Sequence, residues 1–167
     1  MQATRALVIC SSVHHHNTLR VARHIAEVLR AEVAAPADVP ATSVETYGLI
    51  GFGSGVYYGR FHESLRRWVD ALPDRGDVRQ PAFVFSTSGL SFLWTLWHEP
   101  FRQALARKGF DVVGDFHCRG FDRWGPLWFA GGINRGHPDA RDLDRAARFA
   151  ANVARAVRPS EASAAGS

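Results

Sequence analysis

The chain has 167 residues, 46% of them hydrophobic and 22% charged, which is typical of a globular protein long enough to bury a core. Its 20 Lys and Arg against 16 Asp and Glu give a net charge of +4 with His neutral and form no basic block, so we expect no nucleic-acid binding and consider an acidic partner the better interpretation. No apolar run approaches the roughly 18 residues of a membrane span, and no signal pattern opens the sequence, so we expect a cytoplasmic protein without a membrane span.

Strand and helix patterns alternate from the start of the chain. The continuous apolar run at residues 5–10 predicts a strand buried in a parallel sheet. Apolar residues then recur at helical spacing over residues 18–31 and predict an amphipathic helix. Pro36 and Pro40 limit the next strand to residues 32–35, at an edge of the sheet.

The segment CSSVHHHNT, residues 10–18, lies between the first strand and the first helix. A helix start exposes unpaired backbone N–H groups and the positive end of the helix dipole, and the side chains of Ser11, Ser12, Asn17 and Thr18 add neutral donors. Because the segment holds no Lys or Arg, it predicts a phosphate site unlike a P-loop. The three histidines are interpreted as phosphate donors rather than metal ligands, because adjacent side chains diverge and no Asp, Glu or Cys accompanies them.

Two further strands end in small or flat residues. Residues 47–52 predict a buried strand that ends in a loop at residues 53–59, where three glycines allow tight turns and two tyrosines offer flat rings. A helix follows and is ended by Pro73. Residues 82–85 predict the next strand, with a polar exit at residues 86–89. Each exit is a candidate ligand loop.

The last third of the chain continues the same alternation. An aromatic tract leads into a helix that starts at Glu99 and Pro100, and residues 112–118 predict the fifth strand. Residues 119–137 lack periodicity, which favours a functional loop, and a final helix opens at Pro138. We interpret residues 1–158 as a single domain and residues 159–167 as a disordered tail.

This element order predicts an α/β fold, a three-layer sandwich whose five-stranded parallel sheet has the order 2-1-3-4-5. In that topology a ligand binds beyond the carboxyl ends of the strands at the switch point, where segments 11–18, 53–60 and 86–97 converge. Cys10 and Cys118 would lie three strand spacings apart, about 14 Å. We therefore expect free, buried thiols, because a disulfide bridges at most about 7 Å between Cα atoms.

Five segments together resemble the flavodoxin family, and most closely its short flavodoxin-like proteins with a first loop of the type S-x-H-H-G-N-T. These segments, in chain order, are SVHHHNT at 12–18, GFGSG at 51–55, FSTSG at 85–89, GFD at 120–122 and GGINRGHP at 131–138. Each motif alone is weak, and the specificity lies in their common order. The resemblance spans about residues 5–155.

The resemblance implies FMN as the cofactor, a phosphate loop at residues 12–18, and two walls for the isoalloxazine ring. His16 stands where the family usually has Gly, so the phosphate loop requires this residue to adopt the backbone turn that Gly would. No metal ligands are expected. The FMN-binding residues predicted in this way are Ser12, His14, His15, His16, Asn17, Thr18, Ser54, Gly55, Val56, Tyr57, Tyr58, Gly59, Ser86, Thr87, Ser88, Gly89 and Trp94.

The function expected from this resemblance is electron transfer by a non-covalently bound flavin, with a redox partner protein that is acidic. Because residues 53–69 also resemble flavodoxin-like protoporphyrinogen oxidases, the first alternative is an FMN-dependent oxidoreductase acting on a quinone or a porphyrinogen. The second alternative is a non-redox binding module that has lost its flavin. The sequence leaves the choice between carrier and enzyme open and does not specify an oligomeric state.

Overall fold

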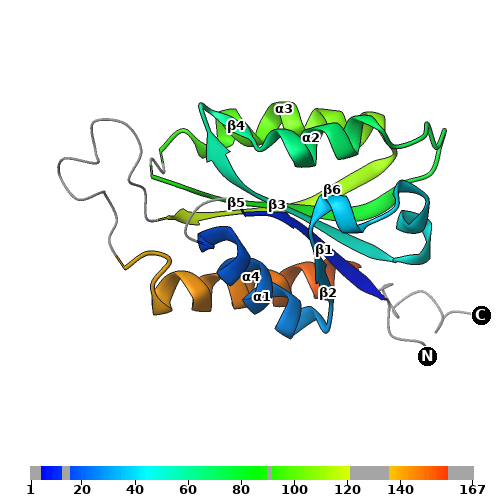
Figure 1. Ribbon diagram of the computed structural model, residues 1–167. Coiled ribbons are helices and arrows are strands. Elements are labelled where there is room, and N and C mark those ends of the chain that lie inside the picture. Colours follow the sequence, from blue (N-terminus) through cyan, green and yellow to red (C-terminus); the bar gives the residue numbers. More distant parts are fainter. Residues whose placement is uncertain (1–4, 13–15, 90–91, 121–135, 158–167) are drawn as a thin grey trace, which may run out of the picture.

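Five parallel strands form the central sheet in the order β2-β1-β3-β5-β6 (Figure 1). The computed structural model describes residues 5–12, 16–89, 92–120 and 136–157. The predicted fold and strand order, 2-1-3-4-5 in the numbering of the five parallel strands, are confirmed. The parallel strands are β1 (Ala6–Ser11), β2 (Glu32–Ala34), β3 (Leu49–Tyr57), β5 (Gln80–Ser88) and β6 (Phe110–Arg119).

Helices cover both faces of the sheet (Figure 1). On one face lie α1 (Asn17–Leu29) and α4 (Ala140–Val157), and on the other lie α2 (Glu63–Asp70) and α3 (Trp94–Arg107). Two short 3-10 helices, η1 (Pro36–Asp38) and η2 (Ala41–Thr46), lead from β2 to β3. Within the described ranges no helix is both long enough and apolar enough to cross a membrane.

Both faces of the sheet are buried, which explains why the strands are continuous apolar runs. Val8 of β1 contributes to the core beneath α1 and α4, whereas its neighbour Ile9 contributes to the core beneath α2 and α3. Neither residue is exposed to solvent. A polar side chain anywhere in the middle of β1 would therefore lie in an apolar layer.

Strands β3 and β5 are longer than the sequence predicts. The predicted ends at residues 52 and 85 are wrong, because β3 runs to Tyr57 and β5 to Ser88. Parallel pairing between the two strands continues as far as Gly55 and Thr87. The polar exits are strand residues, since the backbone ladder with a neighbouring strand outweighs the low strand propensity of Gly and Ser.

The interpretation of the glycines as turn residues is wrong at two of the three positions. Gly53 and Gly55 lie in β3, and only Gly59, with φ 73°, is in a turn. Tyr58, with φ 51°, completes this turn, which leads to a short strand, β4 (Arg60–Phe61), that pairs antiparallel with β3. The sequence did not predict β4.

The glycines of β3 make room for aromatic rings from the neighbouring strand. Gly51 and Gly53 pair in register with Phe83 and Phe85 of β5. A Cβ atom at either glycine would overlap the ring of its partner. The two phenylalanines are fully buried, so their rings have no space to move into.

Helix α3 begins at Trp94, five residues before the predicted start at Glu99, and Pro100 lies inside it. A proline inside a helix removes the hydrogen bond to the carbonyl four residues earlier, here that of Leu96. Leu96 is among the exposed residues of the helix, so water is available to that part of the backbone. The predicted tail at 159–167 and most of the predicted loop at 119–137 lie outside the described residues.

We expect Gly53→Ala to lower the free energy of unfolding by about 1–3 kcal/mol, the usual cost of an overpacked core. The added methyl group overlaps the Phe85 ring. Urea unfolding followed by circular dichroism measures the change. The double variant Gly53→Ala/Phe85→Leu provides the control, because the smaller leucine side chain leaves space for the added methyl group. Phe85→Leu should therefore lower the free energy of unfolding less in the Gly53→Ala protein than in the wild type. Strictly additive losses would contradict the packing argument.

Candidate functional site

The carboxyl ends of β1, β3 and β5 lie side by side, because these strands are parallel neighbours. Ser11 pairs in register with Ser54, Ser54 with Ser86, and Ser86 with His117 of β6. The four residues form one buried polar row across the end of the sheet. The register thus brings together the starts of the three segments that the sequence predicts to converge.

The segment between β1 and α1 is described at Ser12 and again from His16, while His14 and His15 lie outside the described residues. His16 has φ 53° and ψ 21°, the left-handed conformation that favours glycine, and it is the N-cap of α1. The backbone turn required of His16 is therefore present. The Ser12 hydroxyl is buried and has no hydrogen-bond partner within the described part of the chain.

The start of α1 packs against the end of β5. Thr18 is buried, and its Oγ1 lies 2.8 Å from Oγ1 of Thr87. Asn17 is also buried, and a Cβ at Gly120 would lie 3.2 Å from its Nδ2. Helix α1 has no acidic residue in its first turn, so the positive end of its dipole is not neutralised from within the helix. The start of α1, with the positive end of its dipole, is therefore suited to bind an anion.

The β3–β4 hairpin holds the next group of predicted residues. The Ser54 hydroxyl donates to the Gly55 carbonyl at 2.6 Å and accepts from the His62 amide at 2.8 Å, so it closes the hairpin onto the start of α2. The Tyr57 ring packs edge-on against His62, with ring centroids 5.5 Å apart. Tyr58 is 81% exposed. Of these side chains, Tyr58 has the ring surface that a ligand could reach most readily.

The hydroxyl of Ser86, which the sequence predicts as a flavin contact, lies between two histidines. Its Oγ lies 2.7 Å from Nε2 of His98 and 2.9 Å from Nδ1 of His117. Nδ1 of His98 lies 3.0 Å from Oδ1 of Asp115, whose other oxygen forms an ion pair with Arg102. Ser86 and His98 are almost completely buried. The five side chains form a continuous network.

Aromatic rings enclose this network. The Trp94 ring stacks parallel to the His117 ring, with centroids 6.1 Å apart and an interplanar angle of 3°, and it meets His98 edge-on at 5.1 Å. Phe61 of β4 meets His98 from another side at 5.2 Å. Trp94, predicted to cover a flavin, therefore covers His117 in this structure.

Burial determines the charge state of both histidines. It lowers the pKa of His98 to about 4, with a smaller contribution from the positive charge of Arg102. Burial also lowers the pKa of His117 to about 4, and nearby His98 and Arg145 act in the same direction. Both rings are thus neutral at neutral pH, and each has one N–H donor and one acceptor nitrogen.

Sequence reasoning did not identify His98, Asp115 or His117 as residues of interest. A signal was present in the fifth predicted strand, where Asp115 and His117 occur two residues apart, on one face of an otherwise apolar strand. His98 gave no such signal, because its partners belong to β5 and β6.

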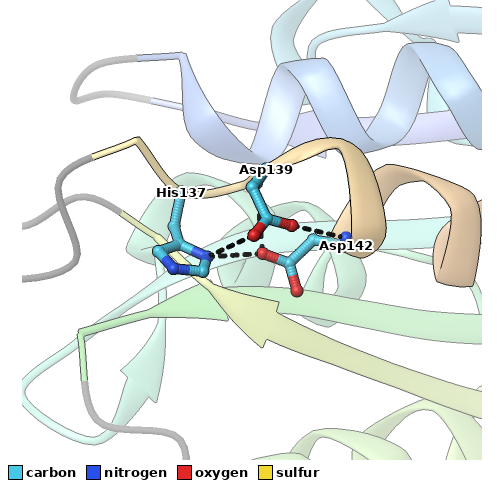
Figure 2. A group of neighbouring side chains, drawn as sticks. All are labelled: His137, Asp139 and Asp142. Carbon is cyan, nitrogen blue, oxygen red and sulfur yellow. Dashed lines mark hydrogen bonds and ion pairs between the residues drawn. The ribbon is translucent and has the colours of Figure 1, made fainter.

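The side chains of His137, Asp139 and Asp142 meet at the start of α4 (Figure 2). Asp139 accepts from the Asp142 amide at 2.9 Å, and Asp142 accepts from the Asp139 amide at 3.1 Å, which is the reciprocal pattern of a capping box. Nδ1 of His137 lies 2.7 Å from Asp142, and Arg145 adds a positive charge at 3.4 Å. Helix capping accounts for this cluster.

The cysteines are free and buried, as predicted. Burial raises the pKa of both Cys10 and Cys118 to about 12, so neither forms a reactive thiolate at neutral pH.

Comparisons with known proteins agree with this geometry. Residues 7–118 match the family model described as a flavodoxin domain. An uncharacterised protein of Methanocaldococcus jannaschii is 37% identical over 149 residues, which cover 89% of this chain and 97% of that protein. Two solved structures share the fold at 17% identity. A flavodoxin from the domain Archaea has a TM-score of 0.68 and covers 92% of this chain and 98% of its own; flavodoxin 2 from Bacillus cereus has a TM-score of 0.66 and covers 91% and 99%.

We expect His16→Gly to raise the free energy of unfolding by about 0.5–1 kcal/mol. Glycine removes the roughly 1–2 kcal/mol cost of a left-handed residue, and the greater entropy of the unfolded chain offsets part of the gain. Urea unfolding measures the change. Arg30→Gly is the matched comparison, because Arg30 ends the same helix with φ 51°. A loss of stability on His16→Gly alone would show that the His16 side chain holds the loop.

Proposed function

The chain belongs to the flavodoxin domain family, and from this membership we propose that it binds FMN non-covalently and transfers electrons. The flavin supplies the redox chemistry in such a protein, while the chain binds and orients it and tunes its potential. The geometry that supports the proposal lies at the carboxyl ends of β1, β3 and β5, the position at which this topology binds its ligands.

The observation that carries the proposal is the buried hydroxyl of Ser12, directly after β1. A buried hydroxyl without a partner costs free energy, and a phosphate oxygen would remove that cost by accepting its hydrogen bond. The left-handed turn at His16 leads directly into the first turn of α1, whose amides point out of the helix. Residues 12 and 16–18 would hold the phosphate, and residues 14 and 15 remain predictions.

The ring would lie between the β3–β4 hairpin and the segment that follows β5. Beside this position the hairpin contacts α3, because a Cβ at Gly59 would lie 3.1 Å from Nε1 of Trp97. Tyr58 on the hairpin offers an exposed flat surface, Ser88 ends the neighbouring strand, and Gly89 follows it. These residues would orient the ring and exclude water from one side of it.

An electron carrier needs a surface on which its redox partner can dock. Tyr58, Phe92 and Leu96 are 81%, 74% and 66% exposed, and all three follow the carboxyl end of a strand at this edge of the sheet. Exposed apolar side chains grouped near a ligand site favour a protein interface. The same residues could contact a quinone or a porphyrinogen, so steady-state turnover with a quinone distinguishes an oxidoreductase from a carrier.

Ser12→Ala should separate flavin binding from folding. We expect the variant to bind FMN at least about tenfold more weakly, because a hydrogen bond to a charged group contributes about 1.5–3 kcal/mol. The flavin-free variant should be at least as stable as the wild type, because the deleted hydroxyl is buried and has no described partner. Quenching of flavin fluorescence measures the affinity, and urea unfolding measures the stability.

Ser11→Ala is the matched control for stability, because the Ser11 hydroxyl does have a partner, Oγ of Ser64 at 2.9 Å, and its loss should destabilise the protein. A wild-type protein that neither quenches FMN fluorescence nor acquires the visible absorption of bound flavin would reject the proposed function and favour a binding module without flavin.

The basic charge of the chain should make the second one-electron reduction of the flavin easier. The net charge is +4, and exposed Arg60 and Arg119 lie in the β4 hairpin and at the end of β6. Added salt screens these charges. Raising the ionic strength should therefore lower the semiquinone–hydroquinone potential of the flavin by on the order of 30 mV, which is about half a decade in the equilibrium constant for one electron. A potentiometric titration in which the potential rises with salt would contradict this.

A further inference from the structure

A chain of polar side chains runs through the α3 layer, from the end of β5 to the solvent. It begins at Ser88, the last residue of β5, whose Oγ lies 3.4 Å from Nε2 of His117. It continues through Ser86 and His98 to Asp115, whose side chain is 15% exposed. The two hydrogen bonds of the Ser86 hydroxyl, to His98 and His117, are 2.9 Å or shorter. Ser86 and His98 are at most 1% exposed, so the middle of this row of side chains is buried.

The hydrogen bonds of this chain can be satisfied in one continuous direction. The Asp115 carboxylate, paired with Arg102, accepts from Nδ1–H of His98. Nε2 of His98 then accepts from the Ser86 hydroxyl, which accepts in turn from Nδ1–H of His117. Nε2 of His117 remains as the acceptor for Ser88. A row of donors that all point the same way is the arrangement through which a proton can move by successive transfers.

The surroundings keep the histidines neutral and keep water away from the chain. Trp94 and Phe61 pack against the rings. Among the described residues, the charged groups near this network are Arg102 and Asp115 at the His98 end, and Arg145 and Asp142 near His117. Burial and the positive charges outweigh the two carboxylates, and the pKa of each histidine falls to about 4.

We propose that Ser88, His117, Ser86, His98 and Asp115 form a proton relay that connects the flavin site at the end of β5 with the solvent near α3. The proposal rests on the proposed function, because the relay needs a bound redox group that gains and loses protons along with electrons. Two imidazoles, two hydroxyls and one carboxylate are connected in series at these five positions.

When a bound flavin passes electrons to an oxidised redox partner, one proton would be released at the end of β5. Ser88 would pass its O–H proton to Nε2 of His117 and would take up the released proton in its place. His117 passes its Nδ1 proton to Ser86, Ser86 passes its own to Nε2 of His98, and His98 passes its Nδ1 proton to Asp115. One proton leaves the site, one reaches the carboxylate at the surface, and the partner gains the electrons. Reduction of the flavin by a donor protein reverses every step.

The tautomers of the histidines test the relay without any flavin. Long-range nitrogen–proton NMR spectra of the flavin-free protein should show His98 and His117 neutral at neutral pH, each with its proton on Nδ1. A protonated ring, or a proton on Nε2 of His98 at neutral pH, would break the donor order and overturn the proposal.

Two variants test transfer itself in the FMN-loaded protein. Ser86→Ala removes the central hydroxyl, and His98→Gln keeps a hydrogen-bonding side chain that does not carry a proton onward. We expect oxidation of the reduced protein by ferricyanide in a stopped-flow experiment to slow by about tenfold or more, as when a positioned proton donor is lost. Added imidazole, a diffusible proton carrier, should restore the rate, which a merely structural defect would not allow.

Gln80→Met is the matched control, since it removes a buried, hydrogen-bonded amide from the opposite end of β5. It should leave the oxidation rate unchanged. Unchanged rates in Ser86→Ala and His98→Gln, or slow rates that imidazole does not restore, would overturn the relay while leaving FMN binding intact. Failure of the wild-type protein to bind FMN would instead reject the proposed function and the relay together.

Discussion

The parallel ladder that joins β1, β3, β5 and β6 is the constraint on which the rest of the structure depends. Its register places Ser11, Ser54, Ser86 and His117 in one row at the end of the sheet, although they are far apart in the sequence. The same ladder sets the glycines of β3 against the aromatic rings of β5, which lets those rings fill the core beneath α1 and α4. A shift of this register by one residue would turn the polar row toward the other face.

The polar row also attaches the sheet to the helices above it. The Ser11 hydroxyl meets Ser64 of α2, Ser54 accepts from the amide of His62 at the start of α2, and Ser86 meets His98 of α3. These contacts satisfy hydroxyl groups that burial would otherwise penalise. They also hold the β3–β4 hairpin and α3 in position beside the strand ends. Interactions within the protein thus place these two elements at the candidate site.

Local patterns predicted the elements well and their ends poorly. The apolar run at residues 5–10 and the helical spacing at 18–31 each match an observed element to within two residues. The exits of β3 and β5 were missed, because Gly and Ser have low strand propensity and only the neighbouring strand compensates for it. The two partners of the Ser86 hydroxyl, His98 and His117, could not be predicted from local patterns, because they lie on other elements of the fold.

The sequence by itself determined the α/β class, the strand order, the free cysteines and the position of the candidate phosphate loop, because each depends on local periodicity or on connection rules. Only the tertiary structure decided that His16 adopts the left-handed turn, that the Ser12 hydroxyl is buried without a described partner, and that His98, Ser86 and Asp115 meet. Those features join residues on separate strands and helices, and no local pattern encodes the distance between side chains that the fold brings together.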